Sequence, residues 1–98
     1  MAERIIIYWR DIPAQVIVRA GRRSEKRELP ERFIQAIDRC AMAVGARDSE
    51  AYLAEWRRGP PEPCGDELVR EADAALTELD RAYDAERLKA LVASGGRA

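Results

Sequence analysis

Residues 4–19 read RIIIYWRDIPAQVIVR, and this stretch decides the fold. It contains two runs, 4–10 and 15–19, that are rich in β-branched and aromatic residues, which is typical of β-strands. A turn is expected between the runs, over residues 11–14. The stretch therefore predicts a β-hairpin near the start of the chain.

The first strand of this hairpin is apolar on both sides. Alternation places Ile5, Ile7 and Trp9 on one face of the strand. Ile6 and Tyr8 then lie on the opposite face. Because a two-stranded ribbon alone is marginal in water, helices, a third strand or another subunit must cover the hairpin.

After the hairpin, the sequence predicts a short polar segment and a first helix. Residues 20–28 are consistent with a loop or with a short third strand at the edge of the sheet. Pro30 suits the first position of a helix, and Gly45 is expected to end it. The buried face of this helix is expected to hold Phe33, Ile37, Cys40, Ala41 and Val44.

Two or three further helices are expected. Asp48 is a suitable N-cap for a helix to about Arg58, followed by a stiff Pro-rich linker over residues 59–63. Asp66 is the expected cap of a third helix to about Asp84, and the apolar residues of 88–92 continue or restart its stripe. The expected buried residues are Tyr52, Leu53 and Trp56 in the second helix, and Leu68, Val69, Ala72, Ala75, Leu76, Leu79 and Tyr83 in the third.

These patterns predict an α+β fold, in which an N-terminal hairpin packs on three to four helices. We expect one domain over residues 1–94 and a frayed tail at residues 95–98. The apolar run at the start is too short and too polar for a signal peptide or a membrane span. With no such signal and only two cysteines, the cytoplasm is the expected compartment.

Charge limits the classes of partner. The formal net charge of the 98 residues is −1, which argues against a protein that coats nucleic acid or an anionic membrane. The average hides a split, because residues 1–61 are net basic whereas residues 62–86 are strongly acidic. The chain can therefore pair its own halves, or dock a partner by charge.

The absence of histidine is the strongest constraint on chemistry. It excludes Ser-His and Cys-His catalysis and His-ligated zinc. Cys40 is expected in the core and Cys64 as an inert thiol, and two cysteines cannot complete a four-sulfur metal site. Asp38 has no second carboxylate or nucleophile suited to acid–base catalysis. We therefore expect no metal and no cofactor, and the sequence favours a protein without catalytic activity.

Three strings, taken in order and spacing, carry a family resemblance: YWRDIPAQV at 8–16, RFIQAIDRCAM at 32–42 and AYLAEW at 51–56. They resemble the small bacterial family called the virulence factor domain, which also forms part of larger proteins named conserved virulence factor C. Stand-alone members like this chain are similar to the products of small open reading frames, which tend to lie next to methylenetetrahydrofolate reductase and corrinoid methyltransferase genes. The resemblance implies an accessory role near one-carbon metabolism, and it carries no catalytic residues.

Two Trp-Arg segments and a basic cluster are candidate binding sites. Trp and Arg are enriched in binding hot spots, but Trp9 also suits the core, and arginines at a helix end also complement its dipole. The basic cluster of residues 19–27 suits a phosphate, a polyglutamate tail or an acidic helix, although it can equally be a solvated loop. The candidate binding residues are Tyr8, Trp9, Arg10, Arg22, Arg23, Trp56, Arg57 and Arg58.

The leading hypothesis is a non-catalytic interaction module or accessory subunit that binds a protein partner, such as a folate or corrinoid enzyme. In one version of this hypothesis, the chain also forms a homodimer through the hairpin. The alternative is a small-ligand binder or minor enzyme that uses the basic loop with Trp9 or Trp56 as a stacking platform. Nucleic acid is not an expected partner, because the basic cluster lacks interleaved aromatic residues.

Overall fold

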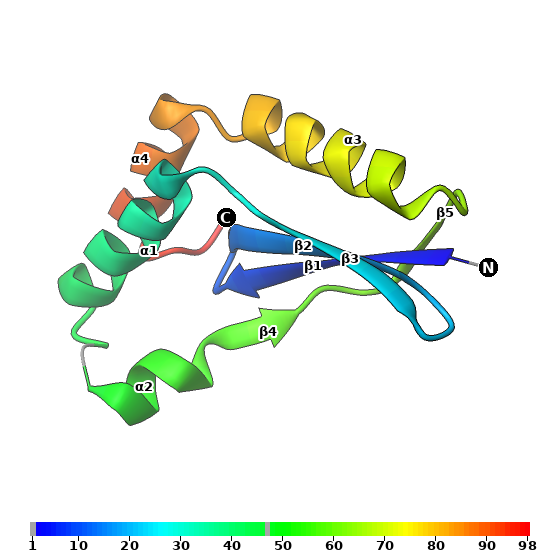
Figure 1. Ribbon diagram of the computed structural model, residues 1–98. Coiled ribbons are helices and arrows are strands. Elements are labelled where there is room, and N and C mark those ends of the chain that lie inside the picture. Colours follow the sequence, from blue (N-terminus) through cyan, green and yellow to red (C-terminus); the bar gives the residue numbers. More distant parts are fainter. Residues whose placement is uncertain (1, 47) are drawn as a thin grey trace.

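The hairpin forms the centre of an antiparallel sheet (Figure 1). The computed structural model describes residues 2–46 and 48–98. β1 (Ala2–Trp9) pairs with β2 (Ile12–Ala20), and β3 (Arg23–Glu28) pairs with the other edge of β2. β4 (Trp56–Arg58) and β5 (Glu62–Cys64) share the outer edge of β1. The third strand that the sequence allowed is therefore present.

Within the described residues, four helices complete the fold. α3 (Leu68–Ala82) lies along one face of the sheet, over β2 and β3. α1 (Glu31–Ala43) and α4 (Ala85–Ala93) pack against each other at one end of the sheet, and α2 (Ser49–Ala54) follows α1. These elements confirm the predicted α+β class, with the apolar stripe of residues 88–92 restarting in a separate helix.

A register shift marks the closed end of the hairpin. Ile5 lies opposite Ile17 and Ile7 lies opposite Gln15, but Tyr8 lies opposite Pro13, so that β2 has one extra residue. Such a β-bulge increases the local twist and re-aims the side chains beyond it. A bulge also accommodates proline, which has no N–H to donate to the ladder.

The core has two parts. One lies at the α1–α4 end of the sheet and is built around Trp9 and Phe33, both fully buried. The other lies beneath α3, where small alanines of the helix meet Val16 and Val18. The buried members are Trp9, Ile12, Ala14, Leu29, Phe33, Ala36, Ile37, Cys40, Ala41, Ala46, Leu88 and Leu91 in the first part, and Ala2, Val16, Val18, Leu68, Ala72 and Ala75 in the second.

The prediction of a helix from Asp48 to about Arg58 is wrong for the second half of this segment. Asp48 does cap α2, because its carboxylate accepts a hydrogen bond from the Ala51 N–H at 2.9 Å. The helix ends at Ala54, however, and the chain turns into β4. The outer edge of β1 would otherwise leave its backbone groups unpaired, and β4 and β5 supply the partners. The expected linker over residues 59–63 therefore includes part of β5.

Other boundaries differ in detail. Gly45 follows the end of α1 with φ of 77°, as expected for a helix-ending glycine. Pro30 precedes α1 rather than starting it. Asp66 does not cap α3, since the cap position is Glu67 and no side chain caps the helix. Three residues expected in the core are exposed instead: Val44, Leu53 and Val69.

Candidate functional site

The two faces of the sheet differ in cover. The strand residues that lie beneath α3 include Val16 and Val18. Ion pairs join the same face to the helix at its rim, with Arg27 Nε 2.8 Å from Asp73 Oδ1 and Arg4 Nη1 3.5 Å from Glu78 Oε2. We call this the α3-covered face.

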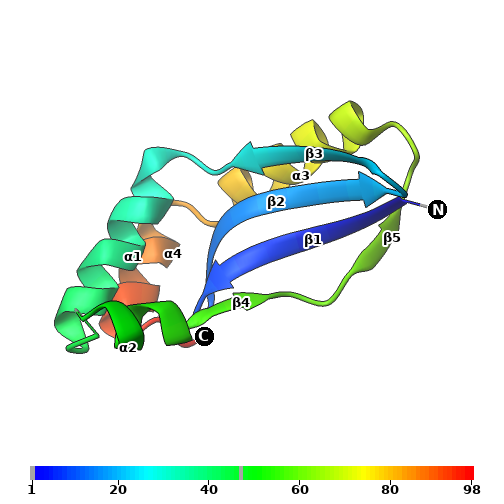
Figure 2. The same ribbon diagram turned by 60° about the horizontal axis from the view of Figure 1, so that its bottom comes forward.

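On the opposite side, Trp9 at the closed end of the hairpin packs against Tyr52 of α2, with ring centroids 5.8 Å apart, but no described helix covers the rows beyond it, from Ile7 to Glu3. Figure 2 looks onto this side, with α3 behind the strands. Its centre is apolar: Ile7 and Ile17 are half-buried, and Ile5 is 2% exposed between Ile17 and the chain that leads to β5. We call it the uncovered sheet face; by register it comprises Glu3, Ile5, Ile7, Gln15, Ile17, Arg19, Ser24, Lys26, Glu28 and Arg58.

Charged side chains rim this apolar centre. In one cross-strand row, Glu3 lies opposite Arg19, and the two form an ion pair at 3.4 Å. At the other end of the face, Glu28 of β3 and Arg58 of β4 lie in the row of Ile7, at opposite edges, and both are exposed. The face therefore combines an isoleucine centre with a rim of both signs of charge.

A second arrangement, which we call the turn clamp, holds the β1–β2 turn. It consists of Arg10, Asp11, Glu55, Arg57 and residues 95–98. The backbone of Arg10 has φ of 54°, in the left-handed region that a tight turn requires. Its N–H donates to Glu55 O at 3.0 Å, and its Nη1 donates to Gly95 O at 2.7 Å. Arg10 thus joins the turn both to the end of α2 and to the chain after α4.

Asp11 receives the other contacts of the turn clamp. Arg57 Nη2 donates to Asp11 Oδ1 at 2.8 Å, and the Ala98 N–H donates to Asp11 Oδ2 at 2.7 Å. The Ala98 hydrogen bond is the main reason why the pKa of Asp11 lies below its usual value, and the bond from Arg57 adds to it. In the structure, residues 95–98 are thus hydrogen-bonded to the turn, and the fraying expected from the sequence stays a prediction.

Gly96 fits this arrangement through its lack of a side chain. Its φ is 81°, and a Cβ there would lie 3.0 Å from Cys40 Sγ and 3.2 Å from Arg10 Cβ. Its carbonyl accepts from the Asp11 N–H at 2.8 Å. The closed end of the hairpin is therefore packed tightly against both α1 and the last residues of the chain.

The predicted aromatic site residues belong to this closed end. Trp9 is 0% exposed, and its Nε1 donates to Tyr52 O at 2.9 Å, so its ring offers no surface for stacking. Trp56 is half-buried and meets the Tyr52 ring edge-on, with centroids 6.0 Å apart. Tyr8 is half-buried under the Arg57 guanidinium, which lies 4.5 Å from the ring centroid, and burial raises the pKa of this tyrosine.

The predicted basic site residues are divided between two ends of the sheet. Arg10 and Arg57 belong to the turn clamp, and Arg58 lies on the uncovered sheet face. Arg22 and Arg23 are exposed at the β2–β3 turn, on the far side of a nine-residue strand that spans about 26 Å. The structure therefore does not bring the basic loop and the two tryptophans together around one pocket.

No catalytic or metal centre is apparent in residues 2–46 and 48–98. No group of three or more Cys, Asp or Glu residues there could hold a metal ion. Burial raises the pKa of both thiols, and at Cys64 the nearby Glu71 adds to the effect, so neither is activated as a nucleophile. Asp38 is exposed. None of the described helices is long and apolar enough to cross a membrane.

Sequence reasoning also missed a groove between α1 and α4. Its cations Arg32, Arg39 and Lys89 come from helical faces that the apolar periodicity marks only as solvated. These cations face one another across the groove only because α1 and α4 pack side by side. The sequence therefore contains no local signal for it.

The fold and these surfaces define a class: a small α+β domain with one helix-covered sheet face and one uncovered sheet face. Its described residues contain no group suited to hold a metal ion. Comparison with protein families makes the assignment specific. The model of the family described as "Virulence factor" matches residues 7–92, and the chain belongs to this family. The match confirms the resemblance and extends it through α3 and most of α4. No curated protein and no solved structure matches the chain.

Proposed function

We propose that this chain is a non-catalytic interaction module that docks through the uncovered sheet face onto a second copy of itself. The observation that carries the proposal is the cluster of Ile5, Ile7 and Ile17 in rows of the sheet that no described helix covers on this side. Antiparallel sheets commonly have one solvated face, and that face is then polar. Ile5 is already buried at 2% exposure, but Ile7 and Ile17 beside it are only half-buried, and partly exposed isoleucines at the centre of such a face are typical of a surface that packs against another layer.

The distribution of charge favours a second copy as the other layer. Glu28 and Arg58 lie at opposite edges of one row, on either side of the apolar centre. A twofold axis parallel to the strands exchanges the two edges, so that Glu28 of each copy lies over Arg58 of the other. Such an isologous interface brings the two isoleucine clusters together. The charged rim then fixes the orientation of the two copies.

The non-catalytic part of the proposal rests on chemistry. The chain has no histidine. Its thiols have raised pKa values, and the described acidic residues form no cluster suited to a metal. An enzyme site normally gathers perturbed titratable groups in a cleft. The groups with shifted pKa values here are dispersed: Arg4 and Arg27 in rim ion pairs, Asp11 in the turn clamp, and Tyr8, Tyr52 and the two thiols, where burial is the main cause.

An accessory role in one-carbon metabolism is the finer part of the proposal, and it rests on the family resemblance alone. In this view the dimer is the form that meets a folate or corrinoid enzyme. Co-purification of the tagged chain with methylenetetrahydrofolate reductase, lost when the uncovered sheet face is altered, would support this role. Purification of the intact dimer without any such enzyme would count against it and would leave the dimer itself standing.

Sedimentation equilibrium tests the dimer. We expect the wild-type chain to have the mass of a dimer at micromolar concentration. Ile7→Glu places a carboxylate in the apolar centre of both copies and should weaken association at least about 100-fold, or roughly 3 kcal/mol. Val69→Glu is the matched control, because Val69 is 53% exposed on α3, away from this face. A monomeric wild type, or equal effects of the two variants, would refute the proposal.

A further inference from the structure

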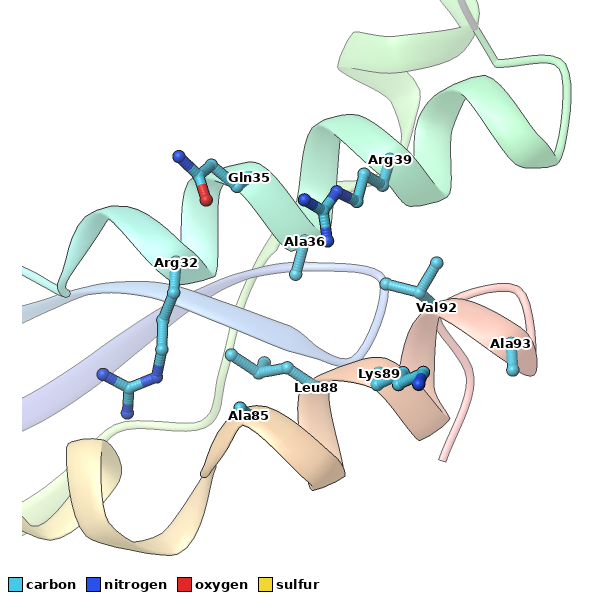
Figure 3. A pocket seen from close by; sticks show the side chains of 9 residues that line it. All are labelled: Arg32, Gln35, Ala36, Arg39, Ala85, Leu88, Lys89, Val92 and Ala93. Carbon is cyan, nitrogen blue, oxygen red and sulfur yellow. The ribbon is translucent and has the colours of Figure 1, made fainter.

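A groove of about 530 Å³ lies between α1 and α4, away from the uncovered sheet face. Figure 3 looks into it, with α1 on one side and α4 on the other. Its floor is apolar and contains Ala36 and Leu88, which are 5% and 4% exposed, and the half-buried Val92. Ala85 and Ala93 also line the groove, and their small side chains leave it open.

All charged residues that line the groove are cations. Arg32 is used within the fold: it pairs with Asp80 at 2.5 Å, and its Nη2 donates to Asp80 O and to Tyr83 O. Arg39 and Lys89 are exposed and have no hydrogen bond or ion pair with any described residue. Two available cations therefore flank an apolar floor, and this combination fits an occupant that is apolar on one side and anionic at its edges.

The cations lie on both sides of the groove, which suits an occupant with anionic groups on two flanks. Arg32 and Arg39 are seven residues apart on α1, or about 10 Å along its axis. Arg39 and Lys89 belong to different helices on either side of the floor. Because Arg32 is paired within the fold, the two available cations, Arg39 and Lys89, approach the floor from opposite helices. They suit a rod that carries several carboxylates, and shallow alanine positions allow the backbone of such a rod to approach closely.

We propose that the α1–α4 groove binds an acidic amphipathic helix of a partner protein, which packs as a third helix beside α1 and α4. Apolar side chains of the partner at i, i+3 or i+4, and i+7 lie on Ala36, Leu88 and Val92. Carboxylates on its flanks meet Arg39 and Lys89. α4 has nine residues, about 13 Å, so the contact covers two to three turns of the partner. This proposal uses no residue of the uncovered sheet face, so the two surfaces can act together.

The test uses a synthetic peptide of about 14 residues, labelled with fluorescein, with leucines at helical i, i+3, i+4 and i+7 spacing and glutamates on both flanks. A scrambled peptide of the same composition lacks the apolar stripe. We expect fluorescence anisotropy to give a dissociation constant below about 100 μM for the designed peptide, and at least tenfold weaker binding of the scrambled one. Amide NMR shifts caused by the designed peptide should be confined to α1 and α4.

A charge-reversal pair separates site-specific binding from general attraction. Arg39→Glu with Lys89→Glu should weaken binding of the designed peptide at least tenfold. Arg22→Glu with Arg23→Glu changes the net charge equally at the exposed β2–β3 turn and should leave the affinity within about twofold. All four substituted residues are exposed, so both variants should remain folded, which circular dichroism verifies.

Three results would overturn the proposal: no binding up to about 1 mM peptide, equal binding of the scrambled peptide, or equal losses in the two charge-reversed variants. A fourth concerns a small-molecule occupant. Anilinonaphthalene sulfonate combines an apolar ring system with one anion. If it binds with NMR shifts on α1 and α4 while the designed peptide does not bind, the groove is a small-ligand site and the helix proposal fails. The state of the dimer does not enter any of these readouts.

Discussion

The α3-covered face and the uncovered sheet face are built from the same strands, yet their side chains differ. Beneath α3, Val16 and Val18 are fully buried against helix alanines, and ion pairs such as Arg27–Asp73 close the rim. On the other side, Ile7 and Ile17 are only half-buried, and no described helix lies over them. The comparison shows that apolar strand residues alone do not indicate which face of a sheet a helix of the same chain will cover.

The largest expected effect comes from placing the same charge on each face. Val18→Glu buries a carboxylate without a partner beneath α3 and should abolish the cooperative fold, since such a change costs several kcal/mol. Ile17→Glu, one residue away on the uncovered sheet face, should leave a folded monomer. Circular dichroism and size-exclusion chromatography read out the two effects. Loss of folding in Ile17→Glu would show that this face is ordinary core.

A change that adds volume sharpens the comparison. Ala75→Leu inserts extra methyl groups at a position that is 1% exposed beneath α3, and it should lower the free energy of unfolding by about 1–3 kcal/mol. Gln15→Leu enlarges the apolar centre of the uncovered sheet face beside Ile7. It should not destabilise the chain, and it should tighten the dimer several-fold. Chemical denaturation measures the first effect and sedimentation the second. Weaker association of Gln15→Leu would contradict the role of this face.

Both faces depend on the strand register, which the turn clamp holds at one end. Gly96→Ala should lower stability by about 1 kcal/mol or more beyond Gly21→Ala. Both glycines have positive φ, but a Cβ at Gly21 meets no heavy atom within 4 Å, whereas at Gly96 it meets Cys40 and Arg10. Thermal unfolding of the two variants compares strain alone with strain plus a steric clash. Equal melting temperatures would show that the last residues do not support the turn.

The smallest effect concerns pH. Because the pKa of Asp11 is lowered in the folded chain, chiefly by the Ala98 N–H, its stabilising contribution is present above the ordinary carboxyl pKa of about 4. It is lost as the pH falls through the lowered value. Asp11→Asn should therefore lower the free energy of unfolding at neutral pH. It should also reduce the further loss of that free energy as the pH is lowered. Urea unfolding between about pH 7 and 2 measures this, and an unchanged acid slope in Asp11→Asn would place the acid sensitivity elsewhere.

Strong local patterns predicted much of the fold. The β-branched run of residues 4–10 and the helical spacing of Phe33, Ile37 and Cys40 were sufficient to place the hairpin and α1. β4 was missed because residues 56–58 continue a helical pattern, and β5 because it overlaps the Pro-rich stretch at residues 59–63. Only pairing with the distant edge of β1 makes these segments strands. Val69 shows the same limit, since an apolar residue at the margin of a helical stripe can remain in solvent.

The candidate surfaces were predictable to different degrees. Alternation in β1 indicated that both sides of the strand are apolar and that the hairpin needs cover. It did not indicate which side α3 would cover, and Ile5 and Ile7 lie on the other side. The tryptophans were named as site residues with a core role as the alternative, and Trp9 is buried because it packs in the core with Phe33 of α1 and Tyr52 of α2. The turn clamp was not predictable, because its contacts join residues up to 87 positions apart in the sequence.

Isotope-filtered NOE spectroscopy on a mixture of labelled and unlabelled chains tests the central claim most directly, because it detects only contacts between copies. If the uncovered sheet face docks onto a second copy, NOEs between chains will connect the methyl groups of Ile7 and Ile17. A dimer whose contacts between chains lie elsewhere, or a chain that shows none at millimolar concentration, would contradict the account.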